Sequence, residues 1–287
     1  MGTIALLTLA ASLLMNAQLL AQHRPLPAGQ RDALETLDNS PRWEQWARVR
    51  DGDGSVNAWL VFPQRSEKAP VVVVLHETSA LTDWIRAVAD QLAAEGFIAI
   101  VPDLLSGKAP GGYGSAAVDE QTAIELVRAL QMDEVNRRLD AVVRHPSTLK
   151  SRFVRSGIKP QDQEIPAPSG KLGFVGFGWG GEVAFQFAAT HSGLDAVVVY
   201  DSAAPEISDL QSMQAPVLAL YGDSDARRMA TTAHTEAEMK KLGKLYEQEV
   251  YEGVDRGFLR LQDPSANRGA AQQAWIRTVR FLKQYLE

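Results

Sequence analysis

The sequence predicts an α/β fold built on a mostly parallel, doubly wound sheet with helices on both faces. Strand-like and helix-like segments alternate along the chain, which is typical of a parallel sheet whose strands are connected by helices. The central strand-like segments are continuously apolar, as in residues 71–75 (VVVVL), and such runs indicate strands buried on both faces. With 287 residues, 45% of them hydrophobic, the chain is long enough to cover both faces of such a sheet.

The elements expected before the central sheet are an amphipathic lead and a hairpin. Residues 28–37 form the lead, and residues 48–50 and 56–62 flank Asp51-Gly52-Asp53-Gly54, a turn sequence that predicts a β-hairpin. The remaining elements follow in order: strand 71–75, helix 81–94, strand 97–101, helices 117–130 and 133–143, strand 171–175, helix 182–190, strands 196–200 and 217–221, helix 231–242, strand 246–251 and helix 270–286.

The domain organisation follows from the two aperiodic parts of the chain. Residues 1–22 carry no charged side chain and contain an apolar run at 4–14, which predicts a signal peptide over residues 1–21. We expect cleavage there, export to the periplasm or beyond, and no stable membrane insertion afterwards. A membrane anchor formed by residues 4–21 and a buried helix are the alternatives. Residues 22–40 are then an N-terminal lead, which includes the amphipathic segment 28–37, and residues 41–287 form one domain.

Residues 147–169 are polar, contain prolines and show no periodicity. We therefore expect a surface loop inserted into the domain, not a domain boundary.

Composition narrows the classes of function. The net charge of −6 argues against a nucleic-acid binder that depends on phosphate contacts. The chain has no cysteine, which excludes disulfides, thiolate zinc sites and a cysteine nucleophile. We expect no metal, no cofactor and no nucleic-acid partner.

The segment 171–182 (KLGFVGFGWGGE) is the most informative motif. A strand that runs through Gly-x-X-x-Gly into a helix has the form of a nucleophile elbow, whose central residue is held in a strained backbone conformation. The central residue here is Gly178, which has no side chain with which to attack a substrate. A phosphate-binding loop is the weaker alternative, because the glycine spacing does not match Gly-x-Gly-x-x-Gly.

The chain resembles the dienelactone hydrolase family of α/β-hydrolases from about residue 41 to residue 286. Six stretches in the family's order carry the resemblance: 71–81 (VVVVLHETSAL), 93–105 (AAEGFIAIVPDLL), 173–181 (GFVGFGWGG), 215–225 (APVLALYGDSD), 250–259 (VYEGVDRGFL) and 270–281 (AAQQAWIRTVRF). The resemblance implies the α/β-hydrolase fold and a small-molecule ester, lactone or carboxylate as substrate or ligand.

The resemblance also implies roles for residues that this chain retains. The family's catalytic acid falls on Asp225, and its glutamate beside the resting nucleophile falls on Glu77. The oxyanion hole, which stabilises the negative charge of the reacting carbonyl oxygen, falls on the backbone N–H groups of Thr78 and Trp179.

Two positions depart from the family pattern. In the branch that this chain resembles best, the elbow carries cysteine and the last motif carries the catalytic histidine. Those positions are Gly178 and Arg256 here. Arginine stays protonated and cannot serve as a general base. We expect Arg256 to form an ion pair with Asp225, either as a structural repair or while also binding a substrate carboxylate.

Two hydroxyls are candidate substrate-binding groups. Ser79 and Ser202 follow strands at the carboxyl edge of the sheet, where ligands bind in such folds. His76 precedes Glu77, and we expect it to be structural or to line the pocket.

Three hypotheses of function remain. In the first, the usual nucleophile–histidine chemistry is lost and a pocket binds a small anionic carbonyl compound. In the second, Glu77 acts as a general base beside the surviving oxyanion hole. In the third, the pocket is filled and the protein serves as a non-catalytic interaction partner. A buried Glu77 with a raised pKa at an open cavity would favour the second.

Overall fold

The computed structural model describes residues 26–52, 54–145, 165–224, 226–262 and 267–287. The expected signal peptide 1–21, most of the expected loop 147–169 and Asp225 lie outside these residues. Within the described ranges, no helix combines the length and the apolar character needed to cross a membrane.

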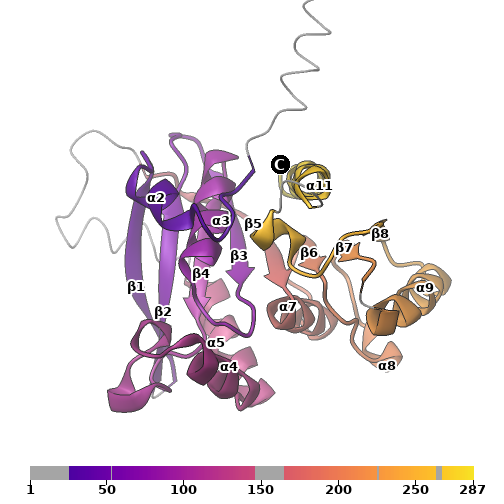
Figure 1. Cartoon of the computed structure of the whole chain (residues 1–287), viewed down its shortest axis with the longest axis horizontal. Coiled ribbons are helices and arrows are strands. Elements are labelled where there is room, and N and C mark those ends of the chain that lie inside the picture. The colour runs from indigo at the N-terminus through magenta and orange to yellow at the C-terminus, as the bar shows by residue number, and fades with distance from the viewer. Residues whose placement is uncertain (1–25, 53, 146–164, 225, 263–266) are drawn as a thin grey trace, which may run out of the picture.

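The described strands form one mostly parallel sheet in the order β1-β2-β4-β3-β5-β6-β7-β8 (Figure 1). The first two strands form the predicted hairpin, with Asp51 opposite Gly54, and β2 pairs antiparallel with β4. The other pairs are parallel. The strands are β1 (Trp43–Asp51), β2 (Gly54–Phe62), β3 (Ala69–Leu75), β4 (Ile98–Asp103), β5 (Pro168–Phe177), β6 (Ala196–Tyr200), β7 (Val217–Gly222) and β8 (Tyr246–Tyr251).

Helices cover both faces of this sheet, so the predicted α/β-hydrolase architecture is confirmed. Residues of α2 (Ala33–Asp38), α3 (Asp83–Ala94), α10 (Phe258–Leu261) and α11 (Arg268–Leu286) join the core on one face. Residues of α5 (Met132–Arg144), α7 (Trp179–Thr190), α8 (Ile207–Leu210) and α9 (Ala226–Lys241) join the core on the other. In Figure 1, α11 and α7 lie on opposite sides of β6.

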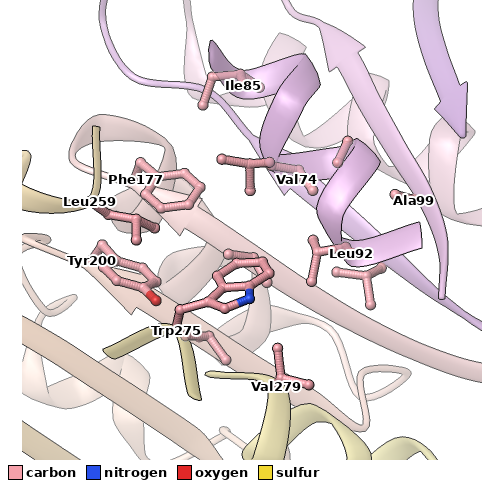
Figure 2. Close-up of a cluster of buried hydrophobic side chains, with 14 of the residues drawn as sticks. Val74, Ile85, Leu92, Ala99, Phe177, Tyr200, Leu259, Trp275 and Val279 are labelled. Atoms are coloured by element: carbon pink, nitrogen blue, oxygen red, sulfur yellow. The ribbon is translucent and has the colours of Figure 1, made fainter. Parts of the chain in front are cut away.

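The two cores arise from the alternation of side chains along the central strands. Val72 and Val74 of β3 belong to one core, whereas Val71, Val73 and Leu75 belong to the other. Figure 2 shows the first core, where side chains from β3, β5, β6, α3 and α11 meet. Strands buried on both faces hold their carboxyl ends rigidly, and the residues that follow those ends form the candidate site.

Some element boundaries differ from the prediction. The strand predicted at 171–175 covers Pro168–Phe177, so the last two residues of the expected loop 147–169 are strand. The helix predicted at 117–130 is a short 3₁₀ turn, Ser115–Ala117, followed by α4 (Glu120–Arg128), because the Asp119 carboxylate caps the helix by accepting the Thr122 N–H at 2.8 Å. The helices α8 and α10 were missed because four residues carry no detectable period.

Candidate active site

The β5–α7 junction has the backbone of a nucleophile elbow. Gly178 has φ 51° and ψ −116°, which confirms the predicted positive φ at this position. The turn passes so close to β3 that a Cβ atom on Gly180 would lie 2.3 Å from the His76 carbonyl oxygen. Glycine is therefore required at position 180 by packing, whatever chemistry the elbow performs.

Ser202, a predicted substrate-binding residue, forms hydrogen bonds that stabilise the elbow. Its hydroxyl donates to the carbonyl oxygens of Tyr200 and Gly178, at 2.8 and 3.0 Å, and the Gly178 N–H donates to the Tyr200 carbonyl oxygen at 2.9 Å. The residue is 1% exposed. The structure thus places Ser202 inside the fold, where it supports the turn and presents no surface to a ligand.

Gly178, Arg256 and Glu77 converge, as the family resemblance implies. A Cβ atom built on Gly178 would lie 3.4 Å from Nη2 of Arg256 and 4.0 Å from Oε1 of Glu77. The guanidinium therefore borders the space that a nucleophilic side chain would occupy. The expected Asp225–Arg256 ion pair stays a prediction, since Asp225 lies outside the described residues.

Glu77 forms an ion pair with a residue that sequence reasoning did not select. Its Oε2 lies 3.0 Å from Nε of Arg260, in the four-residue helix α10. The pKa of Glu77 is raised, first by burial and then by the charges of Asp201 and Glu120, while Arg260 and Arg256 act in the opposite direction. Glu77 therefore takes up a proton more readily than an exposed glutamate.

The two expected oxyanion donors are available. Trp179 is the first residue of α7, so its N–H has no carbonyl acceptor one turn earlier within the helix. Among the described residues, the N–H groups of Thr78 and Trp179 form no hydrogen bond. The positive end of the α7 dipole adds to the attraction for an oxygen that carries negative charge.

His76 has a structural role beside Glu77 and Trp179. Its Nδ1 donates to the Glu77 carbonyl oxygen at 2.8 Å, and its ring stacks on Trp179 with centroids 5.8 Å apart. Burial lowers the pKa of His76, so the ring stays neutral near pH 7.

A cavity of about 400 Å³ opens beside the elbow. Its polar wall includes Gln30, Glu77, Ser79, Glu120 and Arg260, and the Ser79 hydroxyl donates to Oε1 of Glu120 at 2.9 Å. Ser79 thus lines the cavity, and its role in binding a substrate stays a prediction. Gly178 and Arg256 are not among the lining residues, and Glu77 is the residue that the cavity wall shares with the space above Gly178.

Asp201 is a further site residue that sequence reasoning missed. It follows β6 with φ 48°, and its carboxylate accepts the N–H groups of Gly222 at 2.9 Å and Gly257 at 2.8 Å. These bonds join the end of β7 to the loop that carries Arg256. An aspartate directly after a buried strand was the available signal.

Comparisons with known proteins agree with this fold. The sequence pattern of the Dienelactone hydrolase family matches residues 56–286. A Saccharolobus solfataricus protein named "Putative carboxymethylenebutenolidase" is 26% identical over 252 residues, which cover 82% of this chain and 96% of that protein. A Bradyrhizobium protein named "Probable 2-oxo-3-(5-oxofuran-2-ylidene)propanoate lactonase" is 26% identical over 252 residues, covering 84% and 94%.

The crystal structure of the dienelactone hydrolase from Anabaena variabilis superposes with a TM-score of 0.59 at 20% identity, covering 86% of this chain and 99% of that one. At that identity, the structural similarity supports the fold alone. Together with the family pattern, which spans most of the sheet and every strand of the site, it leads to one conclusion: this chain belongs to the dienelactone hydrolase family.

Proposed function

We propose that this protein binds a small carbonyl compound carrying one carboxylate and does not hydrolyse it through a nucleophile–histidine pair. The observation that carries the proposal is the elbow. Gly178 has no side chain, and the guanidinium of Arg256 borders the space where a nucleophile would stand. Covalent catalysis needs a nucleophile and a base within hydrogen-bond reach, and neither position supplies one.

The charges around the site support a monoanionic ligand. Among the groups that line the cavity, Arg260 offers a guanidinium group to a carboxylate. Arg256 and the N–H groups of Thr78 and Trp179 belong to the neighbouring elbow, where the two N–H groups can receive a carbonyl oxygen. Glu77 and Glu120 lie on the same cavity wall and disfavour a second negative charge. A cavity of about 400 Å³ suits a small molecule. The Bradyrhizobium relative's name describes such a substrate, a lactone ring joined to a carboxylate.

Calorimetric titration with an unsaturated γ-lactone that bears one carboxylate tests this proposal, with its neutral methyl ester as the matched probe. We expect the acid to bind at least tenfold more tightly than the ester. Arg260→Gln should remove most of that preference, because a hydrogen bond to a charged group contributes about 1.5–3 kcal/mol. Equal binding of acid and ester, or lactone turnover above about 1 s⁻¹, a typical enzyme rate, would contradict the proposal.

A second candidate function is proton transfer by Glu77. The observation that favours it is a half-buried carboxylate whose pKa is raised and which lines the cavity. Such a group can take a proton from water or from a carbon next to a carbonyl. The developing enolate or oxyanion would then be stabilised by the N–H groups of Thr78 and Trp179.

Proton transfer at carbon is detected by NMR as solvent deuterium entering a 2-oxo acid or lactone probe in D₂O. We expect Glu77→Gln to slow this exchange by at least about 100-fold, the lower range of general-base contributions. Ser79→Ala, a neighbouring change at the cavity wall, should slow it far less. No exchange above the buffer rate in the unaltered protein would leave binding alone as the function.

The raised pKa of Glu77 also predicts a pH dependence of stability. The folded state binds this proton more tightly than the unfolded state, so the contribution of Glu77 to stability falls as pH rises from the ordinary glutamate pKa of about 4.3 through the raised pKa of the folded state. Glu77→Gln cannot titrate. Thermal unfolding of both proteins across this window should therefore show the variant gaining relative stability as pH rises, and a constant difference would contradict the pKa shift.

A further inference from the structure

A strap of residues 26–32 from the N-terminal lead lies against α10. The Gln30 N–H donates to the Arg260 carbonyl oxygen at 2.9 Å, and the Gln262 amide donates to the Pro27 carbonyl oxygen at 2.7 Å. Leu26 and Ala28 pack on the core that α10 and α11 share. The strap precedes residues 56–286, the part of the chain that matches the family pattern. It therefore lies outside the segment that the family pattern matches.

The strap reaches the cavity through one side chain. Oε1 of Gln30 accepts a hydrogen bond from Nη1 of Arg260 at 2.6 Å, and Gln30 lines the cavity beside Glu77. Arg260 is thus held on two sides, by Gln30 at Nη1 and by Glu77 at Nε. Within the described part of the chain, no hydrogen bond from Nη2 accompanies these two contacts.

We propose that Gln30 is a positioning residue that orients the guanidinium of Arg260 between Glu77 and a bound carboxylate. The part concerning the carboxylate rests on the proposed function, whereas the part concerning Glu77 does not. In this role, the lead contributes a residue to the site from outside the part of the chain that the family pattern matches.

The chemistry of the amide suits this role. An amide oxygen holds one N–H of the rigid guanidinium fork without cancelling its charge. A carboxylate at position 30 would instead compete with Glu77 and with the ligand for the same cation. Holding an arginine in its bound orientation also removes part of the entropy that ligand binding would otherwise cost.

The alternative is that Gln30 serves only to attach the strap. Gln262 provides a matched control, because its amide also joins the strap to α10 but contacts the Pro27 backbone instead of Arg260. Gln30→Met and Gln262→Met make the same chemical change, an amide to a thioether of similar length. Gln30 is exposed, so we expect its variants to keep the fold.

The first measurement follows the titration of Glu77 by carbon NMR of side-chain carboxyls in the ligand-free protein. Arg260 lowers the pKa of Glu77, so releasing the guanidinium should move the Glu77 midpoint upward in Gln30→Met. Gln262→Met should leave it unchanged. Gln30→Glu is the second variant, and it should also raise the midpoint by drawing Arg260 away. No shift at position 30, a downward shift, or equal shifts in the two methionine variants would overturn the proposal.

The second measurement is the affinity for the carboxylate lactone and its methyl ester. We expect Gln30→Met to weaken binding of the acid by about threefold to tenfold and to leave the ester unchanged, since the loss is that of one hydrogen bond. An equal loss for the acid and the ester would contradict the positioning of Arg260. If the unaltered protein binds neither probe, the proposed function fails, and the Glu77 titration still decides the role of Gln30.

Discussion

The elbow and the cavity wall are built in different ways. At the elbow, shape is set by backbone contacts, since a Cβ on Gly180 would lie 2.3 Å from a neighbouring carbonyl oxygen, while Gly178 presents no reactive atom. At the cavity wall, shape is set by polar side chains. Gln30 accepts a hydrogen bond from Arg260, and Arg260 forms an ion pair with Glu77. The elbow thus has the backbone shape of a nucleophile elbow with glycine at its centre, and the wall carries polar groups that can act on a ligand.

This difference teaches that the backbone of a catalytic turn and its reactive side chain are separable. The glycines at 176, 180 and 181 are required by the close approach of β3, α7 and Ser202. None of those contacts involves a side chain at position 178. A turn of this shape therefore marks the fold, and the function must be sought in the side chains around it.

The largest expected effect is the loss of the elbow's backbone packing. Gly180→Ala would place a Cβ 2.3 Å from the His76 oxygen and 2.5 Å from the Leu75 oxygen, both backbone atoms that cannot rotate away. We expect a loss of unfolding free energy of about 3 kcal/mol or more, measured by chemical denaturation. Gly193→Ala is the control, because no atom lies within 4 Å of its Cβ position. A loss at Gly180 as small as at Gly193 would show that the turn is loosely packed.

The second expected effect is ester hydrolysis after a nucleophile and a base are introduced at the intact turn. Gly178→Cys with Arg256→His would supply a thiol and a base beside the free N–H groups of Thr78 and Trp179. We expect the double variant to hydrolyse an aryl ester at least about 100-fold faster than either single variant, because nucleophile and base act as a unit.

Two controls accompany this experiment. Gly178→Ala with Arg256→His lacks the thiol and should stay inactive, and alkylation of the thiol should abolish the gained activity. If the double variant folds and remains as inactive as its parent, the geometry of the oxyanion hole differs from that of an active elbow.

The sheet and the elbow were predictable because their signals are local. Runs such as 71–75 indicate buried strands directly, and the glycine spacing around Gly178 indicates a sharp turn with positive φ. The convergence of Glu77, Gly178 and Arg256 came from the family resemblance, which places each at the end of a different strand.

The cavity wall was not predictable in the same way. Arg260 and Gln30 are 230 positions apart, and neither lies in a pattern that indicates a contact. The sequence placed Ser202 correctly after a strand, but a strand end does not say where the side chain points, and this one points inward. Side-chain direction at a strand end depends on the local backbone, and Asp201, the residue before Ser202, has φ 48°.

The third expected effect is a difference in stability between variants of the two candidate substrate-binding serines. Ser202→Ala removes a buried hydroxyl bonded to backbone carbonyls, and we expect it to lower stability by about 1–2 kcal/mol. Ser79→Ala removes a hydroxyl at the cavity wall and should change stability by less than about 0.5 kcal/mol. Thermal and chemical unfolding of both variants measure this contrast. Equal losses would mean that Ser202 does not support the turn.

The smallest expected effect is the strain at Gly178 itself. Alanine there must adopt φ 51°, which costs a non-glycine residue about 1–3 kcal/mol, while the unfolded chain loses entropy that returns about 0.4–1 kcal/mol. We expect a net loss of about 1 kcal/mol by chemical denaturation. Gly243→Ala is the control, since it has φ 67° with open space at its Cβ position, whereas the Gly178 Cβ would lie 3.4 Å from the Arg256 guanidinium. Equal losses at the two positions would assign the whole effect to backbone strain. A larger loss at Gly178 that Arg256→Ala relieves would show that the guanidinium also occupies the space of a side chain at position 178. A gain of stability at Gly178 would contradict the strained geometry of the turn.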